Sequence, residues 1–267
     1  MTPWRPGERL DLKIGNDRLE AACHGPPPEA ADTIVLLHEG LGCVALWRDF
    51  PARLAEATGK GVFLWSRAGY GRSTPCALPR PLDYMETEAR EGLPRILDAI
   101  GFRKGLLLGH SDGASIAALY LRSHADYRVR GLILIAPHFF TEATGLAEVA
   151  RARTAFETGD LRQRLARYHA DPDAAFRGWN DAWLDPDFRA WDITDSLHHI
   201  RVPVLAVQGR DDPYGTRAQT ETLIERVQSP VETSLPRECG HAPHLEQPDA
   251  TLAEIAAFTA RLDRIEG

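Results

Sequence analysis

A serine between two glycines is the first candidate for chemistry in this sequence. Residues 109–113 read GHSDG, with Ser111 at the centre. In the pattern G-x-S-x-G a strand turns sharply into a helix, and the serine takes a strained backbone conformation that exposes its hydroxyl. The flanking glycines let the strand and the helix approach closely. The pattern therefore favours Ser111 as a nucleophile over a small residue at an ordinary turn.

A serine hydroxyl is a weak nucleophile at neutral pH, so it needs a base within hydrogen-bond reach and a group that orients the base. Later in the chain an apolar run leads to Asp211 and Asp212, and His241 follows after one more strand-like stretch. Either aspartate could orient His241. A metal site at His241 and His244 would need further cysteines or histidines at ligand spacing, which the sequence lacks, so we expect no metal.

The four cysteines are not candidates for chemistry. They lie far apart and include no C-x-x-C pair, so they match neither a zinc site nor a redox motif. We expect buried or partly buried reduced thiols. Nothing in the sequence calls for a cofactor. The cysteines are Cys23, Cys43, Cys76 and Cys239.

Short apolar runs indicate the scaffold that holds these residues. Continuous runs of strand length suit strands that are buried on both faces of a parallel sheet, and the segments between them are long enough for crossover helices. The pattern predicts an α/β fold with a mostly parallel central sheet flanked by helices. The predicted strands lie at 33–38, 61–66, 105–109, 131–136 and 202–209.

Apolar residues at helical spacing predict the helices of this scaffold. Two of them lie at 47–58 and 82–100, and Pro94 should kink the second. An alanine-rich helix is predicted directly after Ser111, and a last helix at 250–262.

The alternation of strands and helices breaks at 139–199, where the residues are charged and helical in pattern. We expect a helical insertion there, which would lie as a cap, or lid, over one edge of the sheet. The predicted organisation is an α/β core domain formed by 1–138 and 200–267, with the cap inserted at 139–199.

Length and charge limit the classes of function. A chain of 267 residues is long enough for one such domain with an insertion. The net charge is −7 and lysines and arginines are not clustered, which argues against nucleic-acid binding. The start of the chain lacks a signal core, and no apolar run approaches the ~20 residues that span a bilayer. We expect a cytoplasmic protein without a membrane partner; the sequence leaves its oligomeric state open.

Taken together, these features resemble the α/β-hydrolase-fold serine hydrolases, in the branch of esterases and meta-cleavage-product hydrolases. The resemblance covers nearly the whole chain. It implies that Ser111 is the nucleophile and His241 the general base and acid. Because the family's acid follows the glycine of G-x-x-D by three residues, it also implies that Asp212 rather than Asp211 orients the histidine. The motifs that carry it are LLHEGLG (36–42), WSRAGYGRS (65–73), GHSDG (109–113), GRDD (209–212) and CGHAPHLEQP (239–248).

The same resemblance implies an oxyanion hole made of two backbone N–H groups. One belongs to Asp112, directly after the nucleophile. The other comes from the loop after the first core strand, where we expect Gly40. The family usually has His-Gly after this strand, whereas this chain has His38-Glu39. Glu39 and Leu41 therefore remain alternative donors.

The side chain of Glu39 has two interpretations. Its carboxylate could face the substrate from the oxyanion loop, as a second acidic residue beside Asp112, and would then act against an anionic substrate. It could instead be a solvated loop residue, or a partner of Arg67 or Arg72.

Aromatic residues in the 139–199 segment also have two interpretations. Trp179 and Trp183 are candidate substrate-binding residues, because aromatic side chains could line an acyl or aryl pocket. They could equally form the small core of the insertion and its contact with the sheet. The other aromatic residues considered in this region are Phe139, Phe140, Phe176 and Trp191.

The predicted function is hydrolysis of a small or medium carboxylic ester through an acyl-enzyme, as in the carboxylesterases of class EC 3.1.1. Within the same fold, the alternatives are C–C bond hydrolysis of meta-cleavage diketones, cleavage of an aminoacyl ester or amide, and cyanohydrin lysis. Dehalogenase and epoxide hydrolase activities are disfavoured, because those relatives have aspartate where this chain has Ser111. An alternative of another class is a non-catalytic ligand-binding module on the same fold.

Overall fold

The structure is a computed structural model that describes residues 4–266. Within that part of the chain, eight strands form one sheet in the order β1-β2-β4-β3-β5-β6-β7-β8. The strands β3 to β8 run parallel to one another, whereas β2 is antiparallel to both β1 and β4. The strands are β1 (Arg9–Ile14), β2 (Asp17–His24), β3 (Thr33–Leu37), β4 (Gly61–Trp65), β5 (Gly105–His110), β6 (Val129–Ile135), β7 (Val204–Val207) and β8 (Val231–Ser234).

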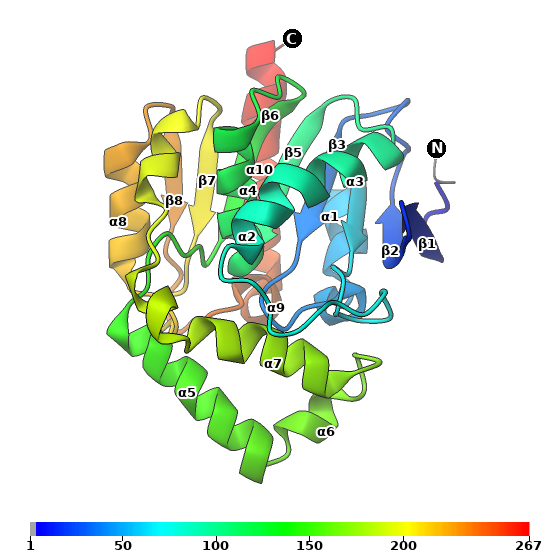
Figure 1. The fold of residues 1–267 in the computed structure, drawn as a ribbon. Coiled ribbons are helices and arrows are strands. Elements are labelled where there is room, and N and C mark those ends of the chain that lie inside the picture. Colours follow the sequence, from blue (N-terminus) through cyan, green and yellow to red (C-terminus); the bar gives the residue numbers. More distant parts are fainter. Residues whose placement is uncertain (1–3, 267) are drawn as a thin grey trace.

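Helices cover both faces of this sheet (Figure 1). The helices that follow or connect strands are α1 (Phe50–Thr58), α2 (Tyr84–Thr87), α3 (Leu93–Ala99), α4 (Asp112–Ser123), α8 (Arg217–Arg226), α9 (Pro243–Glu246) and α10 (Pro248–Glu266). Short turns of other helix types are the 3₁₀ helix η1 (Val44–Trp47) and the π-helical turn η2 (Glu88–Gly92).

Two apolar clusters form the core, one on each face of the sheet. In β3, Ile34 and Leu36 pack in the cluster that includes α1 and α10. Their neighbours Val35 and Leu37 pack in the other cluster, with α2, α3 and α4. Successive side chains of a strand point to opposite faces, so a strand that is apolar at every position holds helices on both sides. The predicted α/β class with a mostly parallel sheet is confirmed.

Helices α5, α6 and α7 of the 139–199 segment lie beyond the lower end of the sheet in the view of Figure 1, whereas its last turn, at 194–199, packs against α4 and α8. His169 connects this segment to the rest of the chain by two hydrogen bonds. Its Nδ1 accepts from the Gly71 N–H at 2.9 Å, and its Nε2 donates to the Leu41 carbonyl at 3.0 Å. Leu41 follows the carboxyl end of β3, so the segment contacts that end of the sheet. Its helices are α5 (Ala143–Thr158), α6 (Leu161–Leu165), α7 (Pro172–Trp183), η3 (Pro186–Ala190) and η4 (Thr194–His199).

The helix predicted at 82–100 is continuous from Tyr84 to Ala99, but a π-helical turn at 88–92 separates α2 from α3. The turn closely precedes Pro94, and there the Leu93 N–H bonds to the Glu88 carbonyl five residues earlier. In the part of the chain that is described, no helix has the length and apolar character needed to cross a bilayer.

Candidate active site

Ser111 lies at a sharp turn between β5 and α4. The strand ends at His110 and the helix begins at Asp112, so Ser111 alone makes the turn, with φ 53° and ψ −119°. This left-handed conformation is strained for a residue with a side chain. Close packing requires the flanking glycines, because a Cβ at Gly109 would lie 2.2 Å from the Gly113 carbonyl oxygen and one at Gly113 would lie 2.1 Å from the Leu37 carbonyl oxygen.

Asp212 and His241 are in direct contact. His241 Nδ1 lies 2.9 Å from Asp212 Oδ1 and 3.0 Å from Oδ2, so Nδ1 carries the proton and Nε2 is left as an acceptor. The Tyr214 N–H donates to Asp212 Oδ1 at 2.9 Å. Burial alone would raise the pKa of Asp212, but the hydrogen bonds from the His241 ring and the Tyr214 N–H bring the pKa below its ordinary value. The carboxylate is therefore ionised at neutral pH.

One cavity of about 250 Å³ contains both Ser111 and His241 in its wall. It lies at the carboxyl ends of the parallel strands, where ligands bind in open α/β sheets. The wall combines apolar and aromatic side chains with a few polar ones, as is usual for small-molecule sites. Its lining residues are Glu39, Gly40, Leu41, His110, Ser111, His138, Gly145, Val149, Trp179, Trp183, Tyr214, His241 and Ala242.

The loop after β3 closes one side of this cavity. Arg67 holds the loop by donating to the carbonyl oxygens of His38 at 2.6 Å and Glu39 at 3.0 Å. The next residue, Gly40, lies directly against the Trp179 ring, and a Cβ there would be 2.1 Å from Trp179 Cδ1. The three donors considered for the oxyanion, in Glu39, Gly40 and Leu41, all belong to residues of the cavity wall.

The Glu39 side chain faces the cavity and its carboxylate lies beside His110. Glu39 Oε2 is 3.5 Å from His110 Nδ1, and 27% of the side chain is exposed. In the described part of the chain, the hydrogen bond from Arg67 to Glu39 goes to the backbone carbonyl and not to the carboxylate. Desolvation would raise the pKa of the carboxyl group, but the contact with His110 outweighs it, and the pKa lies below its ordinary value. The cavity therefore contains an ionised carboxylate.

The Asp112 side chain, in contrast, turns away from the cavity. It is fully buried, and its Oδ2 accepts a hydrogen bond from the Tyr84 hydroxyl. Burial raises the pKa of Asp112, although the charges of Arg67 and Arg80 and the Tyr84 hydrogen bond act in the opposite direction. Only the backbone of Asp112 can act at the cavity. As the first residue of α4, its N–H has no acceptor within the helix.

His138 and Tyr214 lie beside the His241 ring and were not among the sequence candidates. The ring centres of His138 and His241 are 5.5 Å apart, and those of Tyr214 and His241 are 4.7 Å apart. Burial and the neighbouring His241 lower the pKa of His138 to about 3, so His138 is neutral and adds no positive charge beside His241. His138 follows the carboxyl end of β6, and Ser111 follows the carboxyl end of the neighbouring strand β5. That position is the signal that could have identified it.

The remaining candidates lie elsewhere. Asp211 is exposed and donates its N–H to the Cys239 carbonyl, so its side chain takes no part in the contact with His241. His244 is buried between Trp47 and Phe50, with ring centres 4.9 and 5.3 Å away. Of the aromatic residues in the 139–199 segment, Trp179 and Trp183 belong both to the cavity wall and to the apolar core. The other aromatic residues considered from the sequence lie outside the cavity wall: Phe139, Phe140, Phe176 and Trp191.

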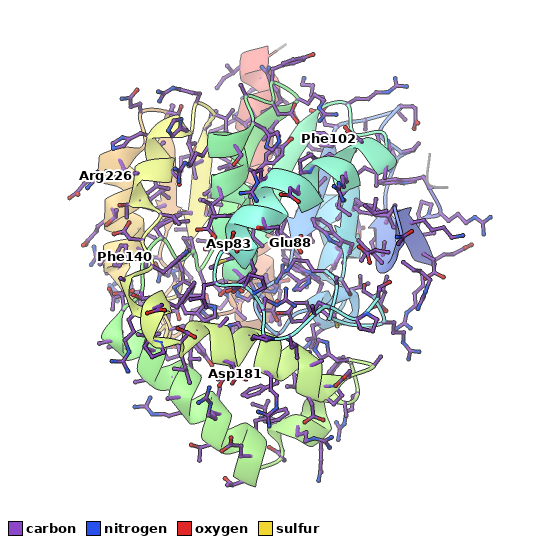
Figure 2. The ribbon with its side chains drawn as sticks, viewed as in Figure 1. Asp83, Glu88, Phe102, Phe140, Asp181 and Arg226 are labelled. Carbon is purple, nitrogen blue, oxygen red and sulfur yellow. The ribbon has the colours of Figure 1, made fainter. Side chains whose placement is uncertain are left out.

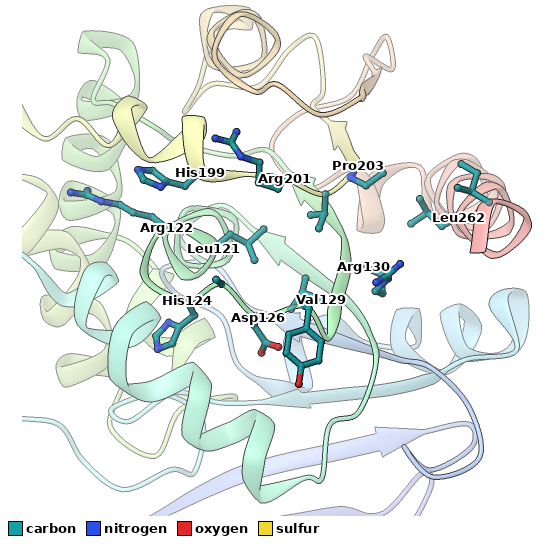
Figure 3. Close-up of a pocket in the computed structure, with 14 residues that line it drawn as sticks. Leu121, Arg122, His124, Asp126, Val129, Arg130, His199, Arg201, Pro203 and Leu262 are labelled. Carbon is teal, nitrogen blue, oxygen red and sulfur yellow. The ribbon is translucent and has the colours of Figure 1, made fainter. Parts of the chain in front are cut away.

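A larger cavity, of about 630 Å³, lies away from this chemistry (Figure 3). Its wall includes Val129, the first residue of β6, and Pro203, which precedes β7. These residues lie at the amino ends of the strands, whereas Ser111 lies at the carboxyl ends. Arg122, Arg130 and Arg201 contribute to a wall that contains no serine, so this cavity does not take part in the chemistry of Ser111.

Comparisons with known proteins show the family and the fold of this chain. The model of the alpha/beta hydrolase family matches residues 34–255. The proline iminopeptidase of Lactobacillus helveticus is 24% identical over 275 residues, which cover 86% of this chain and 90% of the relative. The solved proline iminopeptidase of Mycobacterium smegmatis has a TM-score of 0.76 at 17% identity, covering 97% of this chain and 100% of its own. The esterase EaEST from Exiguobacterium antarcticum has a TM-score of 0.73 at 18% identity, covering 94% and 98%.

Proposed function

The chain belongs to the alpha/beta hydrolase family, and from that premise we propose that it is a serine hydrolase that cleaves small carboxylic esters through an acyl-enzyme. The observation that carries the proposal is the single cavity lined by both Ser111 and His241, with His241 bound to Asp212 through Nδ1. In this proposal residues 139–199 form a cap over a site that is otherwise built by 1–138 and 200–267.

The proposed reaction has two halves. Ser111 Oγ attacks the ester carbonyl carbon while His241 Nε2 takes the hydroxyl proton, and the developing oxyanion accepts hydrogen bonds from the N–H groups of Asp112 and Gly40. When the tetrahedral intermediate collapses, His241 gives the proton to the leaving alcohol. Water then enters, loses a proton to His241 and attacks the acyl-enzyme, which releases the carboxylic acid and regenerates Ser111. Asp212 stabilises the imidazolium in both halves.

The volume and lining of the cavity support a small acyl or aryl group. A volume of about 250 Å³ is below the range of roughly 300–1,000 Å³ that is usual for drug-sized ligands. Leu41, Val149, Trp179 and Trp183 contribute large apolar side chains to its wall. A short acyl chain would fill this space, whereas a long one would have to leave it.

Covalent labelling tests the proposal directly. A fluorophosphonate probe should modify Ser111, as mapped by mass spectrometry of the digested protein, because the probe reacts with serines activated by a neighbouring base. In parallel, kcat/KM should be higher for 2-naphthyl acetate and butyrate than for the palmitate. A protein that is not labelled, or is labelled at another serine, and hydrolyses none of these esters would be a binding module instead.

Glu39 favours a second candidate function, the hydrolysis of aminoacyl esters or amides. Its carboxylate is ionised, lines the cavity and could bind the ammonium group of an aminoacyl substrate. The relative that matches along most of this chain is named a proline iminopeptidase, which is consistent with such a substrate. The His110 ring lies beside this carboxylate, with Nδ1 3.5 Å from Glu39 Oε2.

Replacing Glu39 with glutamine should shift the selectivity toward anionic substrates. The 2-naphthyl monoesters of alanine, isobutyric acid and methylmalonic acid are nearly isosteric and carry a positive, no and a negative charge on the acyl group. Wild-type kcat/KM should fall in that order. In Glu39→Gln the ratio of cationic to anionic ester should fall on the order of tenfold, since two charges 4 Å apart interact by about 4 kcal/mol at an effective dielectric constant near 20 and solvent weakens this. An unchanged ratio would leave Glu39 a structural residue of the loop.

A further inference from the structure

Asp112 is a buried carboxylate that the proposed reaction does not use. Its side chain is 0% exposed, and removing a carboxylate from water is costly unless other groups compensate. Part of the compensation is local, because Asp112 is the first residue of α4 and a negative charge is favoured at a helix N-terminus. Further compensation comes from the charges of Arg67 and Arg80 and from a hydrogen-bond network that reaches Trp183 in the cavity wall.

Three buried side chains form this network. Trp183 Nε1 on α7 donates to the Tyr84 hydroxyl oxygen at 3.1 Å, and the Tyr84 hydroxyl donates to Asp112 Oδ2. The donors point in one direction, toward the charge, which strengthens each bond. Asp112 Oδ1 has no hydrogen-bond partner among the described residues, so Tyr84 supplies the one side-chain hydrogen bond that holds the carboxylate.

The network joins parts of the chain that are far apart in sequence. Tyr84 belongs to α2, which Asp83 and Glu88 flank in Figure 2, and Trp183 belongs to α7, which carries Asp181 below them in the same view. Trp183 is part of the cavity wall and its ring centre is 5.3 Å from that of His138. The two hydrogen bonds therefore connect the cavity wall to Asp112, the residue that directly follows Ser111.

Positive charge links the network to the loop after β3. Arg67 attracts the Asp112 carboxylate and donates to the carbonyl oxygens of His38 and Glu39. Arg80 lies over the rings of Tyr70 and Tyr84, at 4.9 and 5.4 Å from their centres. The backbone segments on both sides of the proposed oxyanion hole are thus fixed by one buried cluster of charged and aromatic groups.

We propose that Tyr84 is a positioning residue: by joining Trp183 of the cavity wall to the Asp112 carboxylate, its hydroxyl holds the Asp112 N–H in the orientation that the oxyanion requires. This inference rests on the proposed serine hydrolase function. In this proposal Tyr84 does not contact the substrate. Its effect is on transition-state stabilisation, because a donor aimed at the oxyanion acts mainly when the negative charge develops.

Tyr84→Phe tests this role, and Tyr70→Phe is its matched control. Both variants remove one buried phenol oxygen from a ring that Arg80 covers, but the Tyr70 hydroxyl has no hydrogen-bond partner in the described part of the chain. Tyr84→Phe should lower kcat for 2-naphthyl butyrate by about 10- to 100-fold with little change in KM. This decrease in kcat does not exceed the one expected when a whole oxyanion donor is lost. Tyr70→Phe should keep kcat within about twofold.

A trifluoromethyl ketone provides the readout that a merely structural role would not change. This inhibitor forms a hemiketal oxyanion on the serine, so its affinity for Tyr84→Phe should weaken by the same factor as kcat/KM. Endpoint labelling with a fluorophosphonate counts the intact sites. If Tyr84→Phe does not fold, Trp183→Phe removes the donor to Tyr84, and kcat/KM and inhibitor affinity should again fall by one common factor.

The possible results separate the two proposals. If the wild-type protein is labelled at Ser111 and hydrolyses the ester, but Tyr84→Phe equals Tyr70→Phe in kcat and inhibitor affinity, the role of Tyr84 is overturned and the hydrolase function stands. If the wild-type protein is neither labelled nor active, the proposed function fails, and the role of Tyr84 falls with it.

Discussion

Replacing Ser111 with alanine should give a folded protein that has lost nearly all ester hydrolysis. The variant has no nucleophile to form an acyl-enzyme, and His241 has no hydroxyl proton to remove. What remains is the contribution of substrate positioning and the oxyanion hole. By analogy with serine proteases that lose their nucleophile, kcat should fall by about 10⁵- to 10⁶-fold. The measurement is kcat for 2-naphthyl butyrate, with endpoint fluorophosphonate labelling to exclude contaminating wild-type protein.

Ser115→Ala is the matched control for this variant. Ser115 lies on the same helix, is fully buried and donates to the His138 carbonyl at 2.5 Å, but it is not part of the cavity wall. Its loss should lower the free energy of unfolding by about 1 kcal/mol, a typical value for one hydrogen bond, while kcat stays within a few fold. Wild-type turnover in Ser111→Ala would exclude the acyl-enzyme mechanism.

Much of the fold could be predicted from the sequence because the central strands are buried on both faces. The apolar runs predicted as strands at 33–38, 61–66 and 105–109 correspond to β3, β4 and β5. The hairpin of β1 and β2 was missed. In β1 exposed and buried residues alternate: Leu10 and Leu12 are buried in the core, and Ile14 packs against it partly buried. Three alternating apolar residues in six give a weak signal beside the continuous runs of the central strands.

The candidate site could be predicted in part because its residues occupy fixed places relative to strand ends. Ser111 and His38 directly follow parallel strands, and the carboxyl ends of such strands meet at one edge. His138 comes three residues after the end of β6, and no partner at a recognisable spacing distinguishes it in the sequence. The contact between Tyr84 and Asp112 depends on how α2 packs against α4, which sequence periodicity does not specify.

The surroundings of His241 explain why its partner should matter for catalysis. His241 must become positively charged in each half of the proposed reaction, and a charge in a partly desolvated site is costly without compensation. His138, which faces it, is neutral and provides none. The Asp212 carboxylate, whose side chain is 1% exposed, is the anion in contact with the His241 ring. Loss of that charge should therefore act on the transition state.

Replacing Asp212 with asparagine should lower kcat by about 10⁴-fold, as the corresponding change does in serine proteases. An asparagine amide can donate to His241 Nδ1, which favours the tautomer that carries its proton on Nε2. In that tautomer Nε2 cannot accept the Ser111 proton, and no carboxylate stabilises the imidazolium. The fold should persist, because asparagine has nearly the same shape and its oxygen can still accept from the Tyr214 N–H, which now lies 2.9 Å from Asp212 Oδ1.

Asp211→Asn is the matched control for Asp212→Asn, because it removes the same charge one residue away, where the side chain is exposed. We expect its kcat to stay within about twofold of wild type, since exposed substitutions away from the site have small effects. The kcat values of both variants for 2-naphthyl butyrate, measured on protein whose folding is checked by thermal denaturation, decide between the two aspartates. If Asp211→Asn loses activity and Asp212→Asn retains it, the contact between Asp212 and His241 is not the one that drives the reaction.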